Sequence, residues 1–201
     1  MGEQSVSRQL TKAIVSRLTQ AIPALDLVYR DLAASPIPSH SPALFALRVA
    51  TSRGGEGAAN ALSKASASTK DDLATVNAAL DDFLLADIVV IGAPMYNLSI
   101  PSQLKAWIDG ISVAGKTFRY TPTGSIGLCK AKRVILASSR GGIYTAPSPA
   151  AAFDYQETYL KGFFTFIGIE DLSIIRAEGV SIDAEHRKNA MESAMAQISA
   201  L

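Results

Sequence analysis

The chain contains one cysteine, one tryptophan and two histidines among its 201 residues. A single thiol, Cys129, excludes an internal disulfide framework and any CxxC metal or redox motif. No positively charged segment followed by an apolar core opens the sequence, so we expect a cytoplasmic protein. Nineteen basic and eighteen acidic residues leave a formal charge of +1. That balance predicts no nucleic-acid partner and no anionic membrane surface.

Long apolar runs are also lacking. The longest spans residues 83–91 and has Asp87 in its middle, which is incompatible with a membrane span. Hydrophobic residues nevertheless make up 48% of the chain, with a mean hydropathy of +0.20. This composition is typical of a folded globular protein, and the length predicts one domain over residues 1–201.

Apolar spacing along the chain alternates between helix and strand patterns. Uninterrupted runs such as Ile88 to Ile91 are typical of parallel strands that are covered on both faces. We expect a loop-rich, mobile insertion with one or two weak helices at residues 39–68. The other predicted strands lie at residues 25–29, 134–137 and 172–175. Helices are predicted to begin behind Ser5 and Ser7 and near Thr69, and to lie at residues 101–113 and 153–166. The last predicted helix follows Asp183, and its inward residues are Ala190, Met191, Ala194, Met195 and Ile198. The pattern predicts a doubly wound α/β sheet.

Ligands of such sheets bind beyond the carboxyl ends of the strands, so the loops there are candidate sites. The loop of residues 92–101 holds two prolines and the aromatic Tyr96, and its stiff backbone suits the edge of a flat heterocycle. It is also compatible with a plain strand-to-helix connection. The loop of residues 138–144 contains Gly141 and Gly142, which permit close backbone approach to a carbonyl or an anion, as they also permit a simple turn.

A third candidate segment is Ser5-Val6-Ser7, at the start of the first predicted helix. Its hydroxyl groups and the free N–H groups of the helix could hold a phosphate. The same two serines would serve equally well as ordinary helix caps.

Four motifs in order along nearly the whole chain resemble one family. They are Pro94-Met95-Tyr96-Asn97, the segments 100–105 and 114–121, and Ser139-Arg140-Gly141-Gly142-Ile143. Together they closely resemble the FMN-dependent NADH-azoreductases, which are flavodoxin-like quinone reductases of bacteria. The resemblance implies a flavodoxin-like doubly wound parallel five-stranded sheet with helices on both faces.

The resemblance also implies site residues. FMN would be bound by Ser5, Val6, Ser7, Pro94, Met95, Tyr96, Asn97, Leu98, Ser139, Arg140, Gly141 and Gly142. A substrate pocket would involve Tyr120, Tyr144, Phe163 and Phe164, partly with the other subunit of a homodimer. No metal and no catalytic side chain is implied, because the flavin carries the chemistry.

The implied activity is transfer of two electrons from NADH or NADPH through FMN to quinones, with reductive cleavage of aromatic azo compounds, in a ping-pong cycle. No acidic or basic ribose-binding pattern distinguishes NADH from NADPH. N–H donors near the pyrimidine end of the flavin would stabilise the negative charge that develops there. The alternatives are a flavodoxin-like electron carrier without turnover of its own, and a degenerate relative that binds nothing.

Two departures from the family stand out. The family begins with a hydrophobic strand and a serine-containing loop that have no counterpart before Gly2. Since that strand is central to the flavodoxin-like sheet, its loss should break the sheet and remove part of the phosphate site, and we hypothesise that the start of the chain is truncated or misassigned. Position 144 is Tyr where many members of the family have His, so a proton-donor role at that position is not carried over to this chain.

Other chemistries find little support. A nucleophilic Cys129, or a hydrolytic Ser138 or Ser139, would need a partner base, and the only histidines are His40 and His186. No cluster of His and Asp has the spacing of metal ligands.

Overall fold

Three parallel strands form the main sheet in the computed structural model, which describes residues 4–201. β4 (Arg133–Arg140) is central, with β1 (Ile88–Pro94) on one side and β5 (Asp171–Glu178) on the other. Residues 134–137 of β4 are fully buried, as expected for the middle strand. The three apolar runs at 88–91, 134–137 and 172–175 are therefore confirmed as parallel strands.

The helices largely follow the predicted positions. The last predicted helix forms, but Met195 is 36% exposed, so the prediction that it points inward was wrong. Its partners Ala194 and Ile198 are buried. The helices are α1 (Val6–Ala21), α2 (Pro42–Arg53), α3 (Gly55–Lys64), α4 (Ala67–Leu85), α5 (Ser102–Ile111), α6 (Tyr155–Phe166) and α7 (Ala184–Ser199), with a short 3-10 helix η2 (Pro149–Phe153) before α6.

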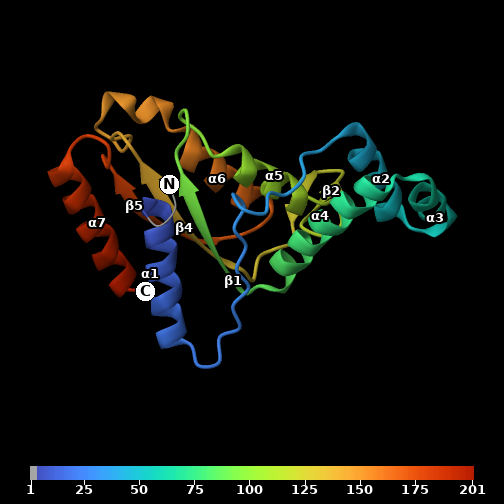
Figure 1. Cartoon of the computed structure of the whole chain (residues 1–201), viewed down its shortest axis with the longest axis horizontal. Helices are drawn as coiled ribbons and strands as arrows, with labels where there is room; N and C mark the ends of the chain where they lie inside the picture. The colour runs from blue at the N-terminus through green and yellow to red at the C-terminus, as the bar shows by residue number, and fades with distance from the viewer. Residues whose placement is uncertain (1–3) are drawn as a thin grey trace. The chain divides into compact units, whose positions relative to one another are not determined.

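Helices cover both faces of the sheet. On one face α1 and α7 pack side by side in a core that includes Ile135 and Ala137 of β4 (Figure 1). Successive side chains of a strand point to opposite faces, so Ser138 and Arg140 point to the other face. There Arg140 contacts Glu157 of α6. The predicted covering of the sheet on both faces is confirmed.

A hairpin of β2 (Phe118–Thr121) and β3 (Gly124–Gly127) packs against the turn that follows α6. Gly127 and Gly168 meet backbone to backbone: a Cβ atom at Gly127 would lie 2.1 Å from the nitrogen of Gly168. Cys129 continues the contact by donating its N–H to the carbonyl of Ile167 at 2.9 Å. These two strands were not predicted. β2 and β3 are short, and β3 has a glycine at each end, so their residues show little periodicity.

The chain forms two compact units. The first comprises the described residues up to Leu27, together with Ala86–Pro101 and Ala114–Leu201; the second comprises Val28–Leu85 and Ser102–Val113. The second unit holds α2 to α5. The two helices α2 and α3 expected within residues 39–68 are present, but the expectation of a loop-rich segment is wrong, because helices occupy most of that range. Its core is formed by Ile37, Leu44, Leu47, Leu73, Val76, Leu80, Phe83, Leu104, Trp107, Ile108 and Ile111. No helix among residues 4–201 combines the length and hydropathy that a membrane span requires.

The predicted strand at residues 25–29 is wrong. That segment has no strand pairing, and Leu27, Val28 and Tyr29 are 55, 65 and 72% exposed. Alternating apolar residues become a strand only when a neighbouring strand accepts their backbone hydrogen bonds. Within the described residues the main sheet has three strands rather than the expected five. The strand hypothesised to precede Gly2 lies outside the described residues.

The outer edge of β1 gives a direct prediction for amide exchange. The carbonyl of Asp87 and the N–H of Met95 both bond to β4, so the odd-numbered residues between them face β4 as well. The N–H groups of Ile88, Val90 and Gly92 face the open edge. We expect these three amides to exchange with deuterium at least about tenfold faster than those of Val89, Ile91 and Ala93, by NMR. Equal protection of both sets would mean that this edge is covered in solution.

Candidate functional site

The three predicted cofactor segments meet at one end of the main sheet. The N–H of Met95 donates to the carbonyl of Ser139 at 2.8 Å, which joins the loops after β1 and β4. Ser7 lies against β1, since a Cβ atom at Gly92 would come within 3.7 Å of the Cβ of Ser7. The N-terminus of α1 therefore lies beside the carboxyl end of β1, where open α/β sheets bind ligands.

Residues 96–99 form a tight turn at the end of β1. Tyr96 and Ser99 exchange two backbone hydrogen bonds of 2.9 and 3.1 Å around Asn97 and Leu98. The φ angles of Asn97 and Leu98 are 47° and 70°, the pair of left-handed residues expected in a type I′ turn. Asn tolerates this region, but a leucine there is strained, and such strain is concentrated at functional sites. The turn leaves Tyr96 45% exposed beside the Ser139 loop.

The strain at Leu98 can be measured by comparing two substitutions. Leu98→Gly and Leu98→Ala remove the same partly exposed side chain, but only glycine adopts φ of 70° without a steric cost. We expect Leu98→Gly to be more stable than Leu98→Ala by about 1 kcal/mol in urea denaturation. Alanine being equal or better would show that the turn is not left-handed in solution.

Peptide groups of the loop after β4 have a fixed orientation. The carbonyl oxygens of residues 140–142 accept hydrogen bonds of 2.9–3.2 Å from the N–H groups of residues 179–181. Because the N–H of a trans peptide points opposite to its carbonyl, the N–H groups of Gly141, Gly142 and Ile143 point away from that segment. None of the three has a hydrogen-bond partner among residues 4–201. They form a row of donors suited to a carbonyl or an anion.

The surroundings of this loop leave little room for a side chain at either glycine. A Cβ atom at Gly141 would lie 3.0 Å from the hydroxyl oxygen of Ser181, and one at Gly142 would lie 3.3 Å from the ring of Tyr144. Both φ angles are ordinary, so the constraint is close packing rather than backbone conformation. The glycine pair therefore lets the loop pack closely against Ser181 and Tyr144, and its contact with a ligand stays a prediction.

The N-terminus of α1 carries two serines that are not engaged as caps. Ser5 occupies the N-cap position, but its side chain makes no capping hydrogen bond. Its hydroxyl lies 3.2 Å from that of Ser7, whose residue is buried. Paired hydroxyls at a helix N-terminus can bind a phosphate together with the helix N–H groups. The Ser5 side chain therefore does not act as an ordinary helix cap in the described structure.

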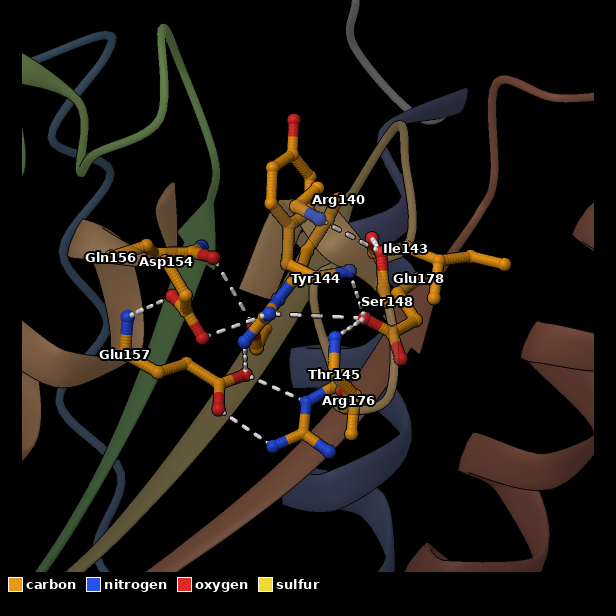
Figure 2. A network of polar contacts seen from close by, with 12 residues as sticks. Arg140, Ile143, Tyr144, Thr145, Ser148, Asp154, Gln156, Glu157, Arg176 and Glu178 are labelled. Carbon is orange, nitrogen blue, oxygen red and sulfur yellow. Dashed lines mark hydrogen bonds and ion pairs between the residues drawn. The ribbon is translucent and has the colours of Figure 1, made fainter. Parts of the chain in front are cut away.

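A buried charge cluster lies beneath the Gly141–Gly142 loop (Figure 2). The fully buried guanidinium of Arg140 contacts three carboxylates: Asp154 at 3.0 Å, Glu157, and Glu178 at 3.8 Å. These are ion pairs whose geometry does not align the Arg140 Nη groups for hydrogen bonds. Arg176 donates to both oxygens of Glu157, at 2.9 and 2.6 Å. Two guanidinium groups thus neutralise most of three acidic charges.

The Glu157 carboxylate is the centre of this cluster. Burial alone would raise its pKa, but the hydrogen bond from Arg176, the charge of Arg140 and the hydroxyl of Ser138 outweigh burial and lower the pKa to about 2. The hydrogen bonds to Glu157 in turn raise the pKa of Arg176. The carboxylate is therefore ionised at neutral pH although its side chain is 2% exposed.

Gln156 of α6 connects the two loops from below. Its Nε2 donates to the carbonyl of Ala93 at 2.5 Å, and its Oε1 accepts from the hydroxyl of Ser138 at 3.5 Å. Ala93 immediately precedes Pro94, and Ser138 immediately precedes Ser139. The start of α6 therefore fixes the spacing of the strand ends from which both loops depart.

A sequence model described as "Flavodoxin-like fold" matches residues 1–201 of the chain. The chain belongs to this family. A curated relative from Bradyrhizobium diazoefficiens, "FMN-dependent NADH:quinone oxidoreductase 2", is 50% identical over 195 residues, which cover 97% of this chain and 91% of the relative.

Solved structures of flavodoxin-like proteins also match. An azoreductase from Bacillus anthracis superposes with a TM-score of 0.84 at 28% identity, over 100% of this chain and 94% of that one. An FMN-dependent NADH-azoreductase from the same species, solved in complex with FMN, gives 0.82 at 30% identity, over 98% and 91% of the two chains. These likenesses and the family match confirm the predicted flavodoxin-like fold.

The residues predicted for a substrate pocket are distributed unevenly in this flavodoxin-like chain. Tyr120 is 75% exposed on the β2–β3 hairpin, and Tyr144 is half-buried beside Gly142. Phe163 is half-buried and stacks edge to face on Phe164 at 5.2 Å. Phe164 is fully buried, so its side chain lies in the core and supports Phe163 from behind.

Competing chemistries remain unsupported in the flavodoxin-like fold. Burial raises the pKa of the Cys129 thiol, and the nearby charge of Lys132 offsets this only partly. The thiol is thus poorly ionised at neutral pH. Within residues 4–201, no group of three His, Cys, Asp or Glu side chains could hold a metal ion.

Sequence reasoning missed the acidic residues beneath the loop. Asp154, Glu157 and Glu178 come from α6 and from the end of β5, far from Arg140 in the sequence. One signal was available: Glu178 ends an apolar strand at the ligand-binding edge of the sheet, as Arg140 does. The side chain of Arg140 points to these carboxylates (Figure 2), and the predicted contact of Arg140 with a cofactor stays a prediction that only its main chain could fulfil.

Proposed function

We propose that this protein is an FMN-dependent oxidoreductase that transfers two electrons from NADH to quinones and reductively cleaves aromatic azo compounds. The observation that carries the proposal is the row of unpaired N–H groups at Gly141, Gly142 and Ile143 beside the Tyr96 turn. The names of the relatives support the same cofactor and donor.

The residues present fit a flavin. A flat ring with carbonyl groups on one edge needs main-chain donors, and the N–H groups of Gly141, Gly142 and Ile143 point away from residues 179–181 and have no partner among residues 4–201. A phosphate tail needs a helix N-terminus, which Ser5 and Ser7 provide at the same end of the sheet. Met95, Tyr96, Asn97 and Leu98, following Pro94, would cover one side of the ring.

When bound, FMN supplies the chemistry, by accepting a hydride and returning two electrons. The chain binds and orients it. The N–H groups of Gly141, Gly142 and Ile143 would donate to the carbonyl groups of the ring and would stabilise negative charge there. Because they are held by residues 179–181 before any ligand arrives, they need no reorganisation. NADH and the acceptor would use the same open face in turn, which makes the kinetics ping-pong.

The acceptor pocket and the assembly belong to the same proposal. Tyr120, Tyr144 and Phe163 would contact the substrate, with Phe164 behind them. The large exposure of Tyr120 supports completion of the pocket by a second subunit, so we propose a homodimer, which light scattering would test. We place the enzyme in the cytoplasm, where NADH is available.

An anaerobic absorbance titration tests the function. FMN-loaded protein is mixed with stoichiometric NADH and then with benzoquinone. We expect complete bleaching of the flavin absorbance and complete recovery. Bound FMN that dithionite reduces but NADH does not would indicate an electron carrier. An FMN spectrum that the protein does not perturb would overturn the proposal.

A further inference from the structure

We propose that Glu178 is a positioning residue for the cofactor loop, acting together with Arg140 from beneath the loop. The proposal rests on the proposed function, because the loop concerned is the one that would bind FMN. Neither side chain needs to touch the cofactor. Their contribution is to fix the direction of the N–H groups that do.

Glu178 holds the far half of the loop. Its Oε2 accepts hydrogen bonds from the N–H of Tyr144 at 3.0 Å and from the N–H of Thr145 at 3.2 Å. Figure 2 shows the carboxylate between these two backbone groups and the guanidinium of Arg140. One carboxylate oxygen thus orders two consecutive peptides in the far half of the loop.

These bonds fix the N–H of Ile143 from both sides. The preceding peptide is held by the bond from the N–H of Gly179 to the carbonyl of Gly142, at 2.9 Å. The following peptide is held by Glu178 and by the hydroxyl of Ser148, which donates to the carbonyl of Ile143 at 2.7 Å. The side chain of Ile143 is 42% exposed, and its N–H has no hydrogen-bond partner among residues 4–201.

Arg140 holds Glu178 in turn. Its Nη1 lies 3.8 Å from Glu178 Oε2 and 3.0 Å from Asp154 Oδ2. The attraction is strong because the guanidinium is fully buried, whereas the Glu178 side chain is 20% exposed. A charged carboxylate at position 178 is therefore required twice, as the acceptor for the loop and as the partner of Arg140.

The test compares Glu178→Gln with Asp171→Asn. Each removes one negative charge from β5, at opposite ends of the strand, and Asp171 makes only an exposed 3.8 Å contact with Arg133. In ligand-free protein we expect Glu178→Gln to speed amide exchange of Tyr144 and Thr145 by about tenfold. In FMN-loaded protein it should weaken FMN binding by about tenfold and change the midpoint potential of FMN. Asp171→Asn should change none of these.

The ligand-free measurement separates this proposal from the proposed function. Absent FMN binding in the wild type would reject the function, while the exchange comparison would still decide whether Glu178 orders the loop. Unchanged exchange in Glu178→Gln would overturn the positioning role. So would a lower melting temperature with unchanged FMN affinity and potential, or equal effects of both substitutions. If Glu178→Gln fails to fold, Ser148→Ala, which removes the bond to the Ile143 carbonyl and the capping bond from the N–H of Ala150, must weaken FMN binding for the proposal to survive.

Discussion

Gly127→Ala is expected to prevent stable folding at ordinary assay temperatures. A Cβ atom there would lie 2.1 Å from the nitrogen of Gly168 and 2.2 Å from the carbonyl carbon of Ile167, and both of these atoms are backbone. Close-packed backbone cannot move aside as a flexible side chain can, so the hairpin must separate from the turn after α6. We expect a loss of at least about 4 kcal/mol in the free energy of unfolding, measured by urea denaturation.

Gly162→Ala provides the matched control. Gly162 lies within α6, only six residues before Gly168, and a Cβ atom there meets nothing within 4 Å. The same substitution should raise stability by about 1 kcal/mol, because alanine favours helix more than glycine does. A stable, wild-type-like Gly127→Ala protein would show that the contact between Gly127 and Gly168 is looser in solution than described.

The second large effect is a loss of stability in acid centred on Glu157. Its pKa in the fold is about 2, against an ordinary value of 4.5. A carboxyl group with a lowered folded-state pKa stabilises the fold above its unfolded-state pKa, and that stabilisation is lost as the pH falls from 4.5 towards 2. From this group alone we expect the free energy of unfolding to fall by about 3 kcal/mol over that range. Urea denaturation at a series of pH values measures it.

Substitution isolates this contribution from that of other acidic groups. Glu157→Gln should cost about 3 kcal/mol at pH 7, because it leaves Arg140 and Arg176 without their shared charged partner. It should also flatten the acid limb of the stability curve. Glu192→Gln is the control: its side chain is 65% exposed and lies 3.8 Å from Lys188, so we expect a change within about 0.5 kcal/mol. Parallel acid limbs for the wild type and Glu157→Gln would contradict the assignment.

Sequence periodicity predicted the buried parts of the fold better than its edges. The run from Val134 to Ala137 forms the central strand. Four consecutive apolar residues in a strand are stable only when both faces of the strand are buried, and the central position buries both faces. The alternating segment at 25–29 has a correct strand pattern but no strand beside it, and pairing cannot be read from one segment. Met195 shows the same limit for helices, since helical spacing does not say how wide the buried stripe is.

In the candidate site, too, local features were predictable from the sequence and long-range contacts were not. The glycine pair at 141 and 142 is a local signal, and the loop that it predicts is present. The support beneath the loop is assembled from α6 and β5, and only the three-dimensional register brings Glu157 and Glu178 to Arg140. The sequence places Arg140 next to the glycine pair and so predicts a cofactor contact. The fold points the Arg140 side chain beneath the loop, towards Glu157 and Glu178.

The orientation of the peptide groups at 140–142 has a consequence for how such a site tolerates mutation. Its ligand-facing atoms belong to the main chain, and only proline deletes an N–H group. Side-chain replacement at Ile143, which is 42% exposed, therefore leaves the donors in place, whereas Ile143→Pro removes one outright. Ordinary substitutions are therefore expected to be most harmful at Gly141 and Gly142, where a side chain has little room, and at Glu178 beneath the loop, rather than at the residues that face the ligand. In a saturation mutagenesis experiment, substitutions of the residues that support the pocket would reduce function more than substitutions of the residues that line it.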